Sequence, residues 1–193
     1  MTTTPGGGAR FAYADPPYPG QAAKHYANHP DFAGEVDHRA LLERLATYDG
    51  FVLHTSSTAL APVLAHASAL FPDVRVGAWV KPFAAFKRNV PVAYAWEPVL
   101  FRPARKPRVS RDCVGRDWIS EPITMRRGLA GAKPDAVCRW VFQVCGLRPN
   151  DIVDDLFPGT GAVTKAWRRW CGERDSRTQI DAPVQPWLLD GGA

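Results

Sequence analysis

The chain has 193 residues, of which 46% are hydrophobic and 22% charged, so it is long enough for one domain with a sizeable core. Its formal net charge of +5 and pI near 9.2 are compatible with a polyanionic partner, although proteins that bind no nucleic acid often have a similar excess. The sequence shows neither a signal-peptide pattern nor an apolar run of membrane-spanning length, so we expect a soluble protein of the cytoplasm.

The four cysteines are expected to be structural thiols. They form no Cys-x-x-Cys pair and have no histidine at zinc-like spacing, so the sequence predicts neither a disulfide framework nor a metal site. Cys138 and Cys145 are seven residues apart on a predicted helix and therefore share a face, which favours core packing.

A short strand is predicted at residues 10–15, after an expected flexible leader at residues 1–9. It ends in Asp15-Pro16-Pro17-Tyr18. A carboxylate and the carbonyl before a proline can accept both hydrogens of an exocyclic amine, while an aromatic ring stacks on a planar base. The alternative is a proline turn that ends a strand, with the tyrosine packed on a neighbour.

A long loop is predicted over this motif, from Pro19 to Val36. Four of its residues or near neighbours are candidate contacts to a base or phosphate, or else solvated side chains: His25, Tyr26, His29 and His38.

The middle of the chain reads as alternating helices and strands. Asp37 is predicted to cap a helix, residues 50–54 a buried strand, and residues 58–70 a second helix. Two further apolar runs, residues 74–80 and 94–101, predict an antiparallel hairpin at the edge of the sheet. The segment between them contains Lys87 and Arg88, which we expect to help hold a substrate.

A basic run lies at residues 102–111, which include five Lys and Arg residues and no acid. Such a run suits phosphate contacts, and equally a solvated loop. It lies within residues 103–131, a segment rich in Pro, Gly and Arg with weak periodicity. The candidate nucleic-acid-binding residues are Lys87, Arg88, Arg105, Lys106 and Arg108.

The last predicted elements are a helix after Lys133-Pro134, a strand at residues 151–156, and a helix that carries Val163 and Trp170. Between the strand and the last helix lies a glycine loop, Asp155-Leu-Phe-Pro-Gly-Thr-Gly161. Glycine tolerates positive φ and lets the backbone approach a ligand closely, although such turns are common without one. Residues 173–193 form a polar tail.

Taken together, these motifs resemble those of S-adenosylmethionine (SAM)-dependent methyltransferases that act on exocyclic amines of nucleic-acid bases. The Asp-Pro-Pro-Tyr motif resembles their catalytic motif, and the glycine loop resembles their cofactor loop. Here the catalytic motif comes first, which is the permuted order of the β-class DNA enzymes and of the related MT-A70-like family, which usually carries Asp-Pro-Pro-Trp. Tyr18 favours the DNA group, and the short 103–131 segment takes the place of its target-recognition segment.

The resemblance implies an α/β Rossmann-like methyltransferase fold with helices on both faces of a permuted, truncated sheet, in one domain over residues 10–172. It implies SAM as the cofactor and DNA as the partner, with RNA as the next substrate. The implied catalytic residues are Asp15, Pro16, Pro17 and Tyr18. The implied cofactor-binding residues are Ala14, Lys133, Asp155, Phe157, Gly159, Thr160 and Gly161.

The chain departs from the family after the last helix, where a strand ending in a ribose-binding acid is expected and is not visible in the sequence. Glu173, Asp175 or Asp181 could substitute, or a homodimer or partner subunit could complete the cofactor site. The sequence therefore leaves three functions open: transfer to adenine N6 or cytosine N4, a non-catalytic binding module on a degenerate fold, and a small-molecule amine methyltransferase.

Overall fold

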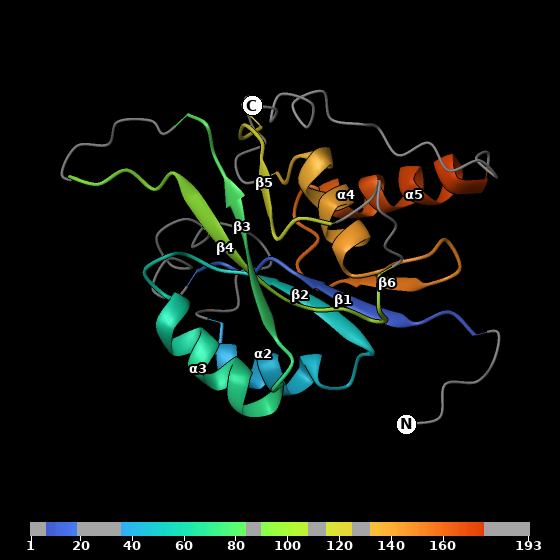
Figure 1. Cartoon of the computed structure of the whole chain (residues 1–193), viewed down its shortest axis with the longest axis horizontal. Coiled ribbons are helices and arrows are strands. Elements are labelled where there is room, and N and C mark those ends of the chain that lie inside the picture. Colours follow the sequence, from blue (N-terminus) through green and yellow to red (C-terminus); the bar gives the residue numbers. More distant parts are fainter. Residues whose placement is uncertain (1–6, 19–35, 84–89, 108–114, 125–131, 176–193) are drawn as a thin grey trace, which may run out of the picture.

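The structure is a computed structural model, and it describes residues 7–18, 36–83, 90–107, 115–124 and 132–175, with side chains up to residue 172. In these ranges a mixed sheet has the strand order β5-β3-β4-β2-β1-β6 (Figure 1). Its strands are β1 (Arg10–Ala14), β2 (Gly50–His54), β3 (Arg75–Val80), β4 (Trp96–Arg102), β5 (Trp118–Ser120) and β6 (Ile152–Asp155).

Three neighbouring strands of the sheet, β2, β1 and β6, run in the same direction. β1 is parallel to both β2 and β6, with Tyr13 opposite Val52 on one side and Asp155 on the other. β4 is antiparallel to β2 and β3, with Val99 opposite His54. The carboxyl ends of β1, β2 and β6 and the amino end of β4 therefore meet at one edge of the sheet.

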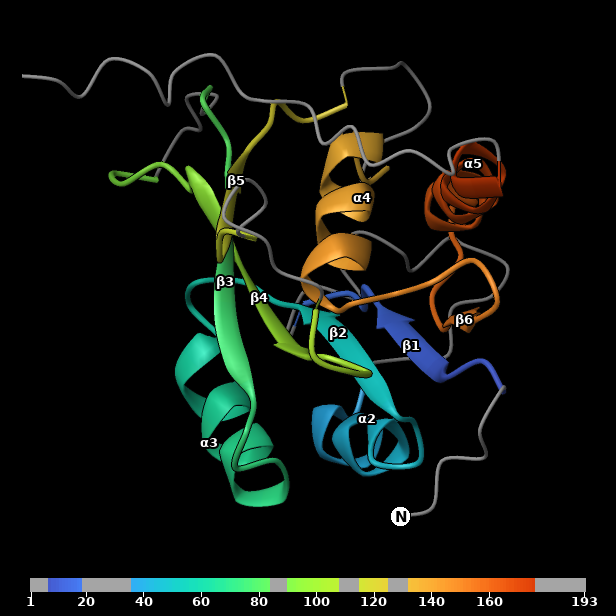
Figure 2. The ribbon, with the colours of Figure 1, turned by 45° about the vertical axis from the view of Figure 1, so that its right-hand side comes forward.

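Helices of the described residues cover both faces of the sheet, as Figure 2 shows. The helices α2 (His38–Leu45) and α3 (Leu60–Leu70) pack on one face, and α4 (Asp135–Val144) and α5 (Ala162–Asp175) pack on the other. Successive side chains of β1 point to opposite faces of the sheet. Phe11 and Tyr13 therefore join the core under α4 and α5, while Ala12 and Ala14 join the core under α2 and α3.

The next described helices after β1 and after β6 lie on opposite faces of the sheet. After β1 the next described helix is α2 on one face, whereas β6 leads directly to α5 on the other. Neighbouring parallel strands whose connections diverge in this way open a crevice beyond their carboxyl ends, which is where open α/β sheets bind ligands. Asp15 and Asp155 lie at this point, at the carboxyl ends of β1 and β6.

Most predicted elements are present within a residue or two of their expected bounds. The Asp37 cap is confirmed, since its carboxylate accepts hydrogen bonds from the backbone N–H of Arg39 at 2.9 Å and of Ala40 at 3.1 Å. The hairpin of β3 and β4 is antiparallel as expected, but its predicted place at the sheet edge is wrong. β4 lies inside the sheet beside β2, and the short β5 from the 103–131 segment pairs outside β3.

None of the described helices combines the length and the apolar character that crossing a membrane requires.

Candidate active site

Asp15 lies directly beyond β1, at the ligand-binding edge of the sheet. Its side chain is 21% exposed, so one part of the carboxylate remains accessible. Pro16 is buried, whereas Pro17 and Tyr18 are half-buried. Because two prolines fix their own φ angles, the backbone that leaves the strand is rigid where the carbonyl of Pro16 must be presented.

The glycine loop lies beside this motif and leads into α5. Gly159 has φ of 44° and Gly161 has φ of 68°, so both predicted glycine positions adopt the left-handed backbone that favours glycine. No atom lies within 4 Å of the position where a Cβ of Gly161 would stand, so the loop is open there. An open glycine turn at a helix N-terminus offers free N–H groups and a partial positive charge to an anionic group such as a carboxylate.

Asp155 anchors the glycine loop from the end of β6. Its carboxylate accepts weak hydrogen bonds from the Phe157 N–H at 3.4 Å and the Thr164 hydroxyl at 3.5 Å. Burial raises the pKa of Asp155 above its ordinary value; the Phe157 N–H opposes this shift, and the negative charge of Asp15 adds to it. The two strand-end carboxylates are therefore close enough to interact.

Lys133 connects the catalytic motif to a second carboxylate that the sequence did not suggest as a site residue. Its Nζ lies 3.0 Å from Asp15 Oδ1 and 2.7 Å from Glu97 Oε1, and its side chain is only 7% exposed. Burial lowers the pKa of the Lys133 ammonium, but the charges of Asp15 and Glu97 outweigh it and raise the pKa above its ordinary value. Lys133 is therefore a buried cation held between two acids.

Glu97 is the centre of this buried cluster. It lies on β4 with 3% of its side chain exposed, and its two oxygens contact three donors: His54 Nδ1 at 2.7 Å, Lys133 Nζ at 2.7 Å and Lys81 Nζ at 3.0 Å. Burial alone would raise its pKa, but Lys133, the His54 hydrogen bond and Lys81 hold the pKa of Glu97 well below its ordinary value.

His54 extends the cluster to Tyr13 on β1. The Tyr13 hydroxyl lies 2.8 Å from His54 Nε2, and burial, with nearby Cys138 next, raises the pKa of Tyr13 well above its ordinary value. A phenol that keeps its proton can donate to Nε2, while Nδ1–H donates to Glu97.

Asp15, His54 and Glu97 have ligand atoms within 4.8 Å of one another, a spacing that would suit a metal ion. The ammonium of Lys133, however, already contacts both carboxylates. Because this tethered cation balances the acids directly, we do not assign a metal to the group.

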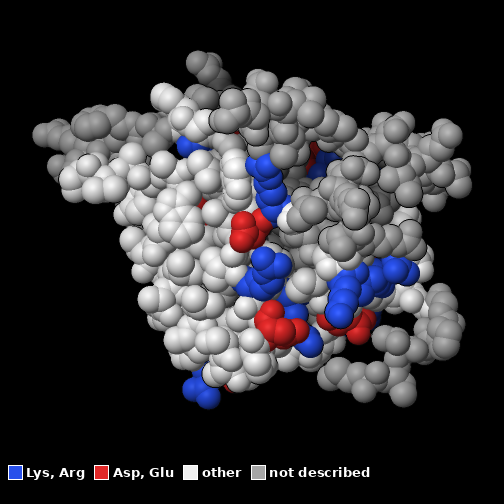
Figure 3. Space-filling view, in the orientation of Figure 1, with Lys and Arg blue, Asp and Glu red and all other residues white. Residues whose placement is uncertain are grey.

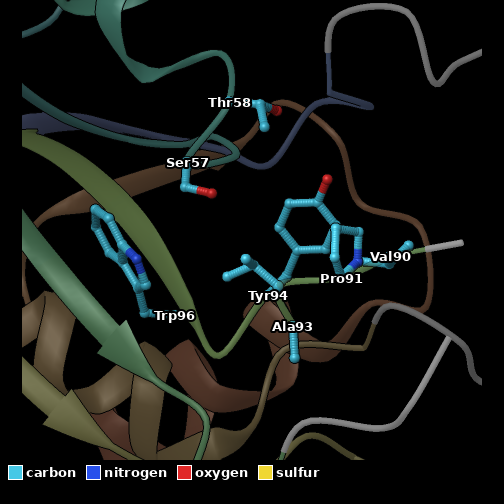
Figure 4. A pocket seen from close by; sticks show the side chains of 8 residues that line it. Ser57, Thr58, Val90, Pro91, Ala93, Tyr94 and Trp96 are labelled. Carbon is cyan, nitrogen blue, oxygen red and sulfur yellow. The ribbon is translucent and has the colours of Figure 1, made fainter.

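A pocket of about 390 Å³ lies at the same edge of the sheet. The rings of Tyr94 and Trp96 and the hydroxyls of Ser57 and Thr58 line it, as Figure 4 shows. These residues come from the segment after β2 and from the amino end of β4, one residue from Glu97. Aromatic walls with a few hydroxyls suit a flat ligand that carries hydrogen-bonding groups.

The structure describes two of the five candidate nucleic-acid contacts, Arg105 and Lys106. Lys87, Arg88 and Arg108 lie outside the described residues, and Lys106 is exposed. Arg105 forms a two-pronged ion pair with the buried carboxylate of Asp151 at the start of β6, and it donates to the Gly146 carbonyl. It therefore lies at the edge of the sheet opposite Asp15, with its guanidinium already engaged.

Two further described arginines, Arg10 and Arg102, are also paired with acids. Arg10 lies 2.9 Å from Asp154, and Arg102 lies 3.1 Å from Asp73. On the face drawn in Figure 3, the described Lys and Arg side chains lie among Asp and Glu rather than in one basic patch. Among the residues that the structure describes, the net positive charge is therefore not gathered on that face.

Sequence reasoning missed Glu97, His54, Lys81 and Tyr13 as members of the site. One signal could have found the first two: a carboxylate and an imidazole stand within otherwise apolar strands, and such groups are rarely buried without a partner. Among the other expected contacts, His38 bonds the Val36 carbonyl at 2.9 Å, while His25, Tyr26 and His29 lie outside the described ranges.

The sequence matches no protein-family model and no curated protein. The solved structure of M1.HpyAVI is similar, with a TM-score of 0.54 and 16% identity over 86% of this chain and 77% of that chain. The solved M1.HpyAVI–SAM complex has a TM-score of 0.51 and 17% identity, over 84% of this chain and 79% of that chain. Together with the sheet topology, this likeness confirms the α/β Rossmann-like methyltransferase fold.

Proposed function

We propose that this protein is a SAM-dependent methyltransferase that modifies the exocyclic amine of a nucleic-acid base, with adenine N6 in DNA as its first candidate target. One observation carries the proposal. The Asp-Pro-Pro-Tyr motif after β1 and the glycine loop after β6 follow neighbouring parallel strands, whose next described helices lie on opposite faces of the sheet. An amine-binding motif thus lies beside a site suited to the cofactor.

The residues present fit SAM. The positive-φ loop at Gly159 and Gly161 and the start of α5 would receive the carboxylate of its methionine part, and Asp155 would orient the loop or bind a polar group of the cofactor. When bound, SAM supplies an electrophilic methyl group. A similar fold was solved as a complex with SAM, which supports this assignment.

Asp15 and the Pro16 carbonyl would activate the amine. The lone pair of an aromatic amine is delocalised into its ring, so the nitrogen is a poor nucleophile. Two acceptors placed on its two hydrogens favour a tetrahedral nitrogen whose lone pair points out of the ring plane. Asp15 need not be a strong base, because the nitrogen loses its proton easily once it has become cationic.

The pocket between the β2 end and β4 supports a planar substrate. Its aromatic side chains would stack on a base, and Ser57 and Thr58 would offer hydroxyls to the edge of that base. Tyr18 would stack from the side of the catalytic motif. A base reaches such a pocket only when it is flipped out of a duplex or already single-stranded.

The test combines cofactor binding with product identification. We expect SAM to bind in isothermal titration, and labelled methyl transfer to single- or double-stranded DNA to yield N6-methyladenine on nucleoside analysis by mass spectrometry. N4-methylcytosine, or transfer to RNA alone, would change the target but keep the reaction. If SAM does not bind, the chain is a non-catalytic module or needs a partner subunit.

Asp15→Ala is the decisive variant. We expect methyl transfer to fall by about 10³-fold, because the acceptor for the amine is lost, while the dissociation constant for SAM stays near that of the wild type. Asp73→Asn, which removes a surface carboxylate paired with Arg102, is the matched control and should keep full activity. Turnover retained by Asp15→Ala would exclude this catalytic assignment.

A further inference from the structure

Glu97 is a buried carboxylate with three hydrogen-bond donors that stabilise its ionised form. The cost of burying a carboxylate is recovered only when donors satisfy it, and here two ammonium groups and an imidazole do so. Glu97 contacts Asp15 only through Lys133, which lies between the two acids. An apolar side chain would be enough to pack this position, since the residues of β4 on either side of Glu97 are apolar.

Charge balance shows what Glu97 contributes. Among the described residues of this cluster, the carboxylates of Asp15 and Glu97 face the ammonium groups of Lys81 and Lys133, so the set is neutral when His54 is neutral. Without Glu97 the same set carries one positive charge. That charge would oppose the sulfonium of the cofactor and the positive charge that develops on the amine during transfer.

Lys133 shares its ammonium group between Glu97 and Asp15. The ammonium lies 2.7 Å from Glu97 and 3.0 Å from Asp15, so its shorter contact is to the more deeply buried of the two acids. If Glu97 were neutral, its oxygen would be a weaker acceptor, and Asp15 would be the one charged partner of Lys133 in this cluster. The Asp15 carboxylate would then be a weaker acceptor for an amine, and its orientation would follow the lysine.

We propose that Glu97 is a positioning residue for the transfer reaction, which holds Lys133 between two carboxylates and thereby keeps Asp15 oriented as an acceptor for the amine. The assignment rests on the proposed function. It adds a residue on β4 that does not touch the substrate, and it gives Lys133 a role toward Asp15 in addition to any contact with the cofactor.

Glu97→Gln tests this role with almost no change in shape. We expect the single-turnover rate of methyl transfer, with SAM and DNA saturating, to fall by roughly 10- to 100-fold, the range typical of losing a partner that orients a functional side chain. The Michaelis constant for DNA should change far less, because Glu97 lies away from the substrate surface. Glu43→Gln, on an exposed pair with Arg39, is the matched control.

The double variant Glu97→Gln/Lys81→Met separates positioning from structure. Lys81 pairs with the other oxygen of Glu97 and its side chain lies over the Trp79 ring, which methionine can also cover. Removing this cation makes the remaining set of charges neutral again. We therefore expect the double variant to transfer methyl groups at least threefold faster than Glu97→Gln. A purely structural role predicts the opposite, since a second buried partner is lost.

Each outcome decides the proposal. A slower Glu97→Gln with partial recovery in the double variant supports it, with circular dichroism and thermal melting showing that both variants fold. Unchanged rates in Glu97→Gln, or a further loss in the double variant, would overturn it while leaving the proposed function intact. A wild-type chain that binds SAM but transfers no methyl group to DNA or RNA would overturn both. If Glu97→Gln alone does not fold, the double variant, which lacks the unbalanced charge, supplies the comparison.

Discussion

At Gly161, we expect a single backbone angle to affect the affinity for the cofactor. Its φ of 68° is costly for any residue with a Cβ, by about 1–2 kcal/mol, even though the space around it is open. We expect Gly161→Ala to weaken SAM binding by about tenfold in isothermal titration, because the loop would move to relieve the strain and lose the backbone conformation proposed to bind SAM. Gly172→Ala, in α5 and with space for a methyl group, is the control.

The result separates strain from volume. Alanine at position 172 should leave SAM affinity unchanged and at most raise the melting temperature, since alanine is the better helix former. If Gly161→Ala binds SAM as the wild type does, the loop does not form the cofactor site.

The candidate catalytic residues could be proposed individually, because a short motif carries the chemistry expected of them. Asp15 and the glycines of the loop are recognisable from neighbours in the sequence, and the structure places them side by side. The Glu97 cluster could not be predicted in this way. Its hydrogen bonds join residues 36 and 43 positions apart, from β2, β4 and the start of α4, and no local pattern specifies such contacts.

At the level of elements, an ion pair fastens β6 to the segment that follows β4. The buried Asp151 carboxylate accepts from Arg105 and from the backbone N–H groups of Ala9 and Arg148. We expect Asp151→Asn to lower the free energy of unfolding by about 3 kcal/mol in urea titrations, because the variant leaves a partly buried guanidinium without its acid. SAM binding should survive, since this contact lies at the far edge of the sheet.

The exposed pair of Arg102 and Asp73 is the comparison for that variant. Asp73→Asn removes a carboxylate that is 64% exposed, and exposed pairs contribute little. A loss for Asp151→Asn no larger than that for Asp73→Asn would show that the ion pair does not fasten the strand.

The limits of element prediction follow from the sheet itself. Helix and strand positions were predictable because apolar residues recur with a clear period, as in Leu41, Leu42 and Leu45 of α2. The three residues of β5 are too few to show a period, and their pairing with β3 depends on the tertiary fold. Strand order also depends on the tertiary fold, so the sequence did not reveal that β4 lies inside the sheet and β5 outside β3.

For the whole molecule, the altered pKa values set the pH range in which the fold is stable. Three described carboxyl groups, those of Asp37, Glu97 and Asp151, have a pKa below their ordinary values of 3.8 to 4.5. For such groups the stabilisation is fully present above the ordinary value and is lost as pH falls through the lower value of the folded state, because the unfolded chain takes up protons first. Asp155, whose pKa is raised, offsets part of this effect.

Groups whose pKa is raised set the opposite limit: first the buried thiols of Cys138 and Cys145, whose ordinary value is 9.0, and then Lys133. The pKa of Lys133 is raised in the fold, so its contribution is fully present below the ordinary value of 10.5 and is lost only as pH rises through the higher folded value. We therefore expect the free energy of unfolding, from urea titrations at several pH values, to stay level between about pH 6 and 9 and to fall steeply below pH 4. In Glu97→Gln the acid-side slope should be shallower, because one group with a lowered pKa is gone. An unchanged slope would mean that Glu97 is not held ionised by its three partners, and the charge balance inferred for the active site would fail with it.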